Sequence, residues 1–258
     1  MVINAKVIDG LRKKHGDAFY LLDSEQFRKN FLELRSAFTE IYHNFNIAYS
    51  YKTNYTPKLC KLVDNLGGYA EVVSEMEVEL AYRCGVRPQR IIWNGPIKNP
   101  DQVKELLFSG GTVNIDSIEE AEFMCKIAKQ ADTRLNVGIR CNYDVKDGVV
   151  SRFGLDVEGE DFRKVLSIFV SAKNIHLSIF HCHFAKRQLE YWPERARGMV
   201  ELMDKFGVIP ERIDIGGGIF GKMEDSLKNQ FPSKIPDYTD YAKASASVFA
   251  DYFKAKGV

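Results

Sequence analysis

Short apolar, β-prone runs alternate with segments of helical periodicity, and this alternation constrains the fold more than any other feature of the sequence. Successive runs are roughly 20 to 40 residues apart, which leaves room for one helix between them. Strands connected in this way run parallel, because a crossover helix returns the chain to the same end of the sheet. The expected strands are seven, at residues 47–52, 69–73, 90–93, 112–115, 135–141, 175–181 and 212–215.

The segments between these runs carry helix-start signals. Ser74 is followed three residues later by Glu77, which is a capping-box pattern. Other helices are expected to begin near Asp23, Asn99 and Ser117, where a polar residue precedes a helical pattern. The remaining ones are expected at 59–66, 161–171, 193–206 and 238–256, and a further short strand at 18–22.

Seven strand–helix units in series favour a closed α/β barrel over an open sheet, because closure removes both sheet edges. The expected fold is therefore a parallel (β/α)8-type barrel over residues 1–258. It is truncated before its eighth strand, because the chain stops after the helix 238–256 that should lead into that strand.

Composition excludes several classes of function. Lys and Arg total 36 against 35 Asp and Glu, and no long block of like charge occurs, so neither a nucleic-acid nor a membrane partner is expected. The five cysteines are scattered and form no C-x-x-C pair, which argues against a disulfide framework or a zinc site. The N-terminal residues contain no apolar core of signal-peptide length, so a cytoplasmic setting is expected.

The carboxyl ends of the strands are where a parallel α/β barrel places its active site. Nearly every expected strand here ends in a polar residue or a glycine that could bind or react. These residues are Lys52, Glu71 to Ser74, Asn94, Gly95, Asn114, Asp116, Arg140, His181, His183 and Gly216 to Gly218.

Lys52 closes the first of these strands, in the stretch NIAYSYKTNY. A lysine at the end of a buried strand lies at the rim of a low-dielectric site. Desolvation there disfavours the ammonium and leaves a nucleophilic amine suited to Schiff-base chemistry. The alternative is a lysine that leaves the strand and points into water. This stretch by itself favours the solvated alternative, since most lysines are solvated.

Three glycines, Gly216, Gly217 and Gly218, follow the seventh strand directly. Backbone N–H groups of such a loop can cradle a phosphate, and barrels often build a phosphate site after strands 7 and 8. The alternative is a flexible turn.

His181 and His183 share one face of their strand, because side chains alternate with period 2. They could bind a metal, stack on a flat cofactor or be buried core histidines. No further ligand lies at metal-site spacing, so no metal is expected. Arg140 could pair with a ring oxygen or a carboxylate, or could form a structural salt bridge.

These segments together resemble the fold-type III pyridoxal-phosphate decarboxylases, which include the diaminopimelate, ornithine and arginine decarboxylases and relatives with the alanine-racemase fold. The resemblance extends from about residue 18 to residue 258. It is carried by the segments YSYKTN, EVVSEMEVELAYRCG, IIWNGPIK, VNIDSIEEAE, IRCNYD, SRFGL, HCHF and DIGGGIFG.

The resemblance implies a role for each matching residue. Lys52 would form the Schiff base with pyridoxal 5′-phosphate, and His183 would stack on the pyridine ring. Arg140 would lie near the ring hydroxyl. Glu71 and Glu77 would lie near the lysine, where the family usually has an aspartate and a glutamate. The backbone of Gly216, Gly217 and Gly218 would hold the phosphate.

Two departures from the family pattern stand out. The family commonly has Ile-Gly-Ser after the histidine, and its serine meets the phosphate, whereas this chain has Phe184-Ala185-Lys186. The family's Glu-Pro-Gly-Arg motif and its C-terminal β-domain are also absent from this sequence. The chain is therefore expected to be a fragment of a longer protein that forms a homodimer.

The resemblance implies decarboxylation of an amino acid of the diaminopimelate, ornithine, lysine or arginine type through the Lys52 Schiff base. Two alternatives remain open. One is a racemase of the same fold, and the other is a protein that binds pyridoxal phosphate without catalysis.

Overall fold

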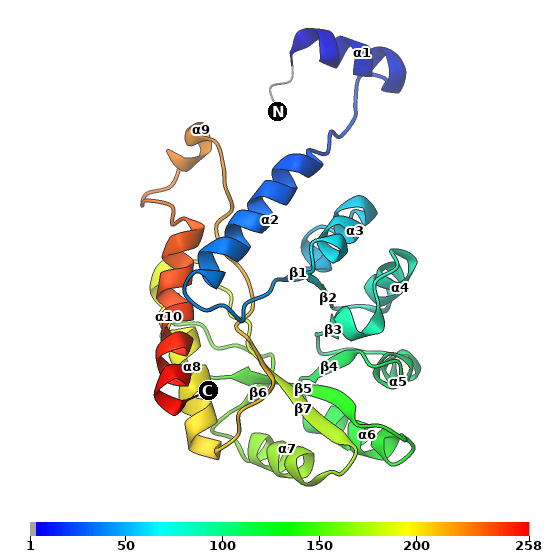
Figure 1. The fold of residues 1–258 in the computed structure, drawn as a ribbon, viewed down its shortest axis with the longest axis vertical. Helices are drawn as coiled ribbons and strands as arrows, with labels where there is room; N and C mark the ends of the chain where they lie inside the picture. The colour runs from blue at the N-terminus through cyan, green and yellow to red at the C-terminus, as the bar shows by residue number, and fades with distance from the viewer. Residues whose placement is uncertain (1–3, 258) are drawn as a thin grey trace.

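The computed structural model describes residues 4–257 and contains the expected parallel sheet (Figure 1). Seven strands pair in the order β1-β2-β3-β4-β5-β7-β8, every pair is parallel, and a short β6 pairs with β5. The strands are β1 (Ala48–Ser50), β2 (Tyr69–Val72), β3 (Ile91–Trp93), β4 (Thr112–Ile115), β5 (Leu135–Asn142), β6 (Leu155–Asp156), β7 (Ile175–His181) and β8 (Arg212–Asp214).

Helices separate the strands, as the periodicity predicts, and most begin at the expected polar residue. Asp23, Ser74, Asn99 and Ser117 each accept a backbone N–H bond with the side chain, as N-caps do. The α-helices are α1 (Ala5–His15), α2 (Ser24–Thr39), α3 (Pro57–Asn65), α4 (Glu75–Arg83), α5 (Pro100–Phe108), α6 (Ile118–Ala128), α7 (Glu160–Ser171), α8 (Trp192–Phe206), α9 (Asp225–Lys228) and α10 (Tyr238–Lys256).

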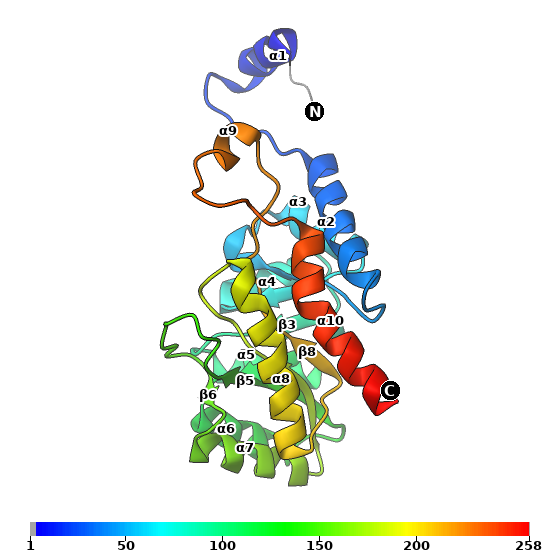
Figure 2. The ribbon, with the colours of Figure 1, turned by 90° about the vertical axis from the view of Figure 1, so that its left-hand side faces the viewer.

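The sheet is a half-barrel that stays open between β8 and β1, since no pairing joins these two strands within residues 4–257. The outer layer of helices nevertheless continues across the opening, because α10 packs against both α8 and α2 (Figures 1 and 2). A separate apolar cluster fills this contact. It is made of Ala37, Phe38, Trp192, Tyr238, Tyr241, Ala242 and Ala246. The truncated barrel expected from the sequence is confirmed.

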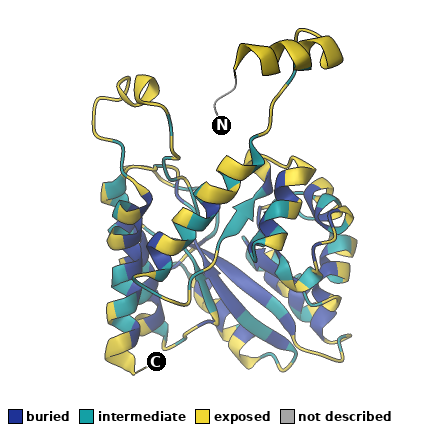
Figure 3. Cartoon of the chain, turned by 45° about the horizontal axis from the view of Figure 1, so that its top comes forward, coloured by how far each residue is buried: buried dark blue, intermediate teal, exposed yellow. Residues whose placement is uncertain are grey.

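The main core lies between the sheet and the helices α3 to α8, where the central strands β2 to β5 are mostly buried, whereas every residue of the edge strands β1 and β8 is half-buried (Figure 3). Parallel strands covered on both faces read as continuous apolar runs rather than alternating ones. Such a run is visible in Ile91–Trp93, whose three residues are all buried.

One expectation for the N-terminal segment is wrong. Residues 18–22 form no strand, and Tyr20 is fully exposed, because no neighbouring strand is within reach to pair with this segment. Residues 5–15, for which no element was predicted, form helix α1, which projects from the rest of the molecule and buries none of its residues (Figure 1). Local signals alone explain it, because Asn4 caps the helix and Arg12 pairs with Asp17.

Gly198 in α8 provides a test of this packing. A Cβ at this position would lie 2.1 Å from the ring of Tyr143. Alanine is favoured over glycine in helices by about 1 kcal/mol, but overpacking a core costs about 1–3 kcal/mol. We expect Gly198→Ala to lower the free energy of unfolding by about 1–2 kcal/mol in urea denaturation.

Gly10→Ala is the matched control, because a Cβ at Gly10 in α1 would meet nothing within 4 Å. This variant should leave global unfolding unchanged and raise only the helix content. If Gly198→Ala raised the free energy of unfolding instead, the Tyr143 ring would be able to move at no energetic cost, and the prediction would be wrong.

Candidate functional site

Lys52 lies in a 3-10 turn, Tyr51–Thr53, that directly follows β1. Two hydrogen bonds fix this turn. The Thr53 hydroxyl donates to the Ser50 carbonyl at 2.7 Å, and the Tyr49 hydroxyl donates to the Asn54 carbonyl at 2.9 Å. Thr53-Asn54 thus ends the strand as a turn, and the lysine emerges at the carboxyl edge of the sheet.

Of the two alternatives for Lys52, this structure shows the solvated one. The side chain is exposed, since it leaves a turn at the sheet edge rather than a buried strand position. Its charge acts on other strand-end residues. It adds to the larger effect of burial in lowering the pKa of His181 and His183, and it opposes the burial-driven rise in the pKa of Glu77 and Asp214. Lys52 therefore lies within electrostatic range of these four residues.

A buried polar chain crosses three neighbouring strand ends beneath the lysine. The Asn94 amide donates to Glu71 Oε1 at 3.0 Å, and the Asn114 amide donates to Asn94 Oδ1 at 2.7 Å. All three side chains are less than 9% exposed, so each bond forms in a low-dielectric interior, where hydrogen bonds are stronger. The chain fixes the Glu71 carboxylate at the end of β2.

Glu77 lies beside Glu71 but makes a different bond from the one its capping-box position predicts. Ser74 accepts from the Glu77 N–H, whereas the Glu77 carboxylate accepts from the Val73 N–H at 2.7 Å and not from Ser74. Burial and the nearby Glu71 charge raise the pKa of Glu77. Its side chain thereby lies at the β2 strand end, next to the site.

Arg140, at the end of β5, forms an ion pair with Asp116 at 3.4 Å, and both side chains are nearly buried. Asp116 Oδ2 also accepts the N–H of Gly154 at 3.1 Å. Gly154 has a positive φ of 81°, and a Cβ there would lie 2.9 Å from Arg140. The structural salt bridge is thus present, and the SRFGL segment serves to hold Arg140 in place.

His181 and His183 lie at and just after the end of β7 and are both uncharged near neutral pH. Burial, together with Arg140, Lys52 and other nearby cations, lowers the pKa of each to about 3. His181 is buried, and its Nδ1 has no hydrogen-bond partner among residues 4–257. His183 is half-buried, so part of its ring faces the open side of the site.

Asp214 is a site residue that the sequence patterns did not single out. Its carbonyl accepts the Cys182 N–H and its Oδ1 accepts the Gly216 N–H, both at 2.8 Å, so it ties the β7 end to the glycine loop. Burial raises the pKa of Asp214 to about 6. An aspartate directly before a glycine-rich loop is a common turn signal and could have pointed to it.

The three glycines differ in their surroundings. A Cβ at Gly216, where φ is 72°, would lie 2.4 Å from the Cys182 carbonyl, so only glycine allows the loop to approach β7 this closely. A Cβ at Gly217 would meet no atom within 4 Å, and one at Gly218 only the Cβ of Arg187 at 3.9 Å. The loop is therefore packed on one side and open on the other.

The structure brings the predicted residues together at one edge of the sheet. Lys186, which stands in the segment where the resemblance expects a phosphate-binding serine, is directed elsewhere. Its ammonium donates to the Asp147 carbonyl and lies over the Tyr191 ring.

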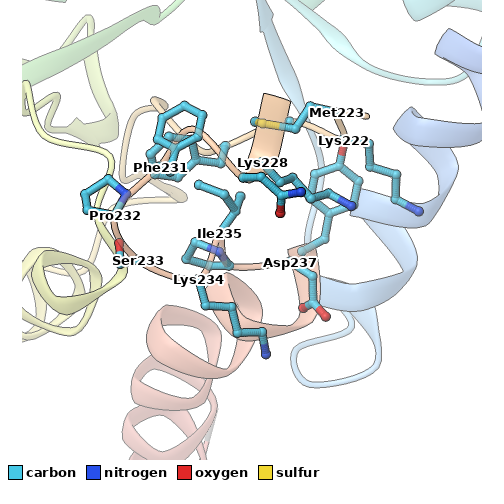
Figure 4. A pocket seen from close by; sticks show the side chains of 14 residues that line it. Lys222, Met223, Lys228, Phe231, Pro232, Ser233, Lys234, Ile235 and Asp237 are labelled. Carbon is cyan, nitrogen blue, oxygen red and sulfur yellow. The ribbon is translucent and has the colours of Figure 1, made fainter. Parts of the chain in front are cut away.

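One pocket lies away from this edge. It has a volume of about 730 Å³ and is lined by residues between 220 and 238, among them Phe231 and Ile235 (Figure 4). None of the strand-end residues lines it, so we place the candidate site at the strand ends. Within residues 4–257, no group of three or more His, Cys, Asp or Glu side chains could hold a metal ion, and no helix is long and apolar enough to cross a membrane.

The fold and site define an α/β half-barrel with a cluster of titratable residues at the carboxyl edge of its sheet. Residues 25–257 match the family model for the pyridoxal-dependent decarboxylases, in its pyridoxal-binding domain. The chain therefore belongs to this family, whose cofactor is pyridoxal phosphate.

Relatives and solved structures agree with the family match. Diaminopimelate decarboxylase of Aquifex aeolicus is 26% identical over 88% of this chain and 56% of its own length. The Methanocaldococcus jannaschii enzyme, solved with L-lysine, superposes with a TM-score of 0.79 at 24% identity over 96% of this chain and 60% of that one. SrLDC, solved with PLP and cadaverine, gives 0.73 at 19% identity over 99% and 61%. The chain spans little more than half the length of such relatives.

The two histidines give the stability a pH dependence. Their folded pKa of about 3 lies below the unfolded value of about 6.5, so the unfolded state binds more protons as the pH falls below 6.5. The free energy of unfolding should fall on acidification, by up to about 1.4 kcal/mol per pH unit for buried His181 and less for half-exposed His183. Urea denaturation at pH 6.5 and 4.5 should show a smaller loss in His181→Gln than in wild type.

Asp214 opposes this trend, because its raised pKa lets the folded state take up a proton first between pH 6 and 4. His15→Gln, at an exposed position in α1, is the control and should behave like wild type. An equal loss in wild type and His181→Gln would contradict the prediction.

Proposed function

We propose that this chain is the cofactor-binding half-barrel of an amino-acid decarboxylase and that Lys52 holds pyridoxal phosphate through its amine. The observation that carries the proposal is that Lys52, His183 and the glycine loop follow the parallel strands β1, β7 and β8 and so lie at one edge of the sheet. A lysine, an aromatic ring and a glycine loop at one edge suit a flat cofactor with a phosphate at one end.

The residues present fit such a cofactor. The open side of Gly217 and Gly218 leaves room for a phosphate against the backbone. Half-buried His183 is uncharged, so its ring can stack on a pyridine ring without carrying a competing charge into the site. Arg140 is held by Asp116 in an ion pair. After burial and Lys52, its charge also lowers the pKa of His183, and it would lie near the ring hydroxyl of the cofactor.

When bound, the cofactor supplies an electron sink for the bond that breaks at the substrate Cα. The chain's own residues position and charge the site. Lys52 would attach the cofactor through its Nζ, and its free amine would hold a proton at that atom. Glu71, fixed by Asn94, and Glu77 would lie near the lysine and keep negative charge beside its ammonium.

The proposed substrate is an amino acid of the diaminopimelate, lysine, ornithine or arginine type. It is supported by the family match and by the diaminopimelate decarboxylase of M. jannaschii, which was solved with L-lysine. A cytoplasmic location and a homodimeric full-length protein remain predictions.

Replacement of Lys52 tests the cofactor assignment. Added pyridoxal phosphate should give wild type a visible absorbance band that Lys52→Ala lacks, because the covalent attachment is lost. Borohydride reduction followed by peptide mass spectrometry should place the label on Lys52. Lys58→Ala removes an exposed lysine at the start of α3 and should retain the band. Labelling at another lysine would reject the assignment.

Release of carbon dioxide tests the reaction. With the longest available form of the protein, we expect cofactor-dependent release from at least one of these four amino acids, abolished by Lys52→Ala, because the reaction requires the attached cofactor. Exchange of the α-hydrogen with deuterium from solvent, without carbon dioxide release, would instead identify a racemase. Cofactor binding with neither reaction would identify a binding protein.

A further inference from the structure

Arg195 in α8 is a fully buried guanidinium with no acidic partner among residues 4–257. It lies 4.6 Å from the centre of the Trp192 ring, and its backbone carbonyl accepts the hydroxyl of Tyr143 at 2.6 Å. A buried charge without a counter-charge costs free energy, so its retention needs an explanation. Burial lowers the pKa of Arg195 from its ordinary value of 12.5, but an arginine stays charged at neutral pH.

The guanidinium binds backbone carbonyls instead of a carboxylate. Nη1 donates to the Gly217 carbonyl at 3.1 Å, and Nη2 donates to the carbonyls of Phe184 and Lys186. Two of these carbonyls belong to the loop after β7, and the third belongs to the glycine loop after β8. Arg195 therefore joins the two loops that flank the proposed phosphate position.

These bonds also fix the direction of three N–H groups. The C=O and N–H of a trans peptide point in opposite directions, and no cis peptide occurs in residues 4–257. The N–H groups of Ala185, Arg187 and Gly218, which share peptides with the three bound carbonyls, therefore point away from Arg195. None of them has an acceptor among the described residues.

The two loops lie close together at this point. A Cβ at Gly218 would lie 3.9 Å from the Cβ of Arg187, and one at Gly217 would meet nothing within 4 Å, so the glycine loop is open beside the loop after β7. On the far side of this loop, the Tyr241 hydroxyl from α10 donates to the Arg187 carbonyl at 2.6 Å and holds the segment in place.

We infer that Arg195 is a positioning residue for the cofactor phosphate. By drawing three carbonyls toward itself, it turns the Ala185, Arg187 and Gly218 N–H groups toward the anion and places a positive charge behind them. In this chain the Ala185 and Arg187 N–H groups take over the contact that the family's serine makes. The inference rests on the proposed function.

Comparison of two ligands tests this role. Pyridoxal 5′-phosphate and pyridoxal differ only in the phosphate, so the ratio of their affinities measures the contribution of the phosphate group to binding. Equilibrium dialysis with the whole chain should show that Arg195→Met lowers the affinity for the phosphorylated ligand by about tenfold or more, which corresponds to loss of one charge-assisted bond. The affinity for pyridoxal should be nearly unchanged, and Arg195→Lys should restore part of the ratio.

Arg197→Met is the matched control, because Arg197 lies on the same helix, is exposed and pairs with Glu194. It should keep the wild-type ratio. Circular dichroism should verify that each variant folds.

If Arg195→Met does not fold, Ala185→Pro removes one N–H donor at an exposed position and should lower the ratio, whereas Ala185→Ser should not. Unchanged ratios in the folded Arg195 and Ala185 variants would overturn the inference while leaving cofactor binding intact. An equal loss for both ligands would overturn it too, since it would mean general structural damage. If wild type binds the two ligands equally, the chain has no anion cradle, and both this inference and the proposed phosphate position fail.

Discussion

The parallel direction of the seven strands is the constraint on which the rest of the structure depends. Because every strand from β1 to β8 points the same way, all their carboxyl ends lie at one edge of the sheet. The charge of Lys52 then reaches Asp214, which is distant in sequence, and opposes the rise in its pKa that burial causes. Antiparallel pairing would send alternate strand ends to opposite edges and would leave no shared site.

Parallel pairing also requires cover on both faces and at the edges of the sheet. The half-barrel has two unpaired edges, at β1 and β8, and the contact of α10 with α2 lies across the opening between them. Tyr241 of α10 joins two further parts of the chain, since its ring packs on Trp192 of α8 while its hydroxyl donates to the Arg187 carbonyl in the loop after β7. The closure of the helix layer is therefore coupled to the position of the loop after β7.

Periodicity and caps were sufficient to predict the seven strands, their parallel order and most helices, because those signals are local. Because the carboxyl ends of parallel strands share one edge, the sequence also predicted that Lys52, Glu71, Arg140 and His183 lie at the same edge. The direction of the Lys52 side chain could not follow from a strand pattern. Residues 18–22 failed because a β-prone run forms a strand only where another strand can pair with it. Arg195 was missed because an arginine on a helix reads as solvent-exposed, and only the tertiary structure buries it.

The chemistry of the buried Arg195 explains why its partners are carbonyls. A carboxylate in the same place would neutralise the guanidinium and repel an anion on the other side of the loop. Carbonyls satisfy the donors without adding a net charge, and each one aligns a peptide dipole whose positive end faces outward. The peptides whose carbonyls belong to Gly217 and Phe184 therefore present their positive ends at the surface of the loop. Together with the charge of Arg195 behind them, they create a positive potential where a phosphate can bind. His183, with its lowered pKa, adds no positive charge of its own. The positive potential in the site then comes only from groups that bind the anion.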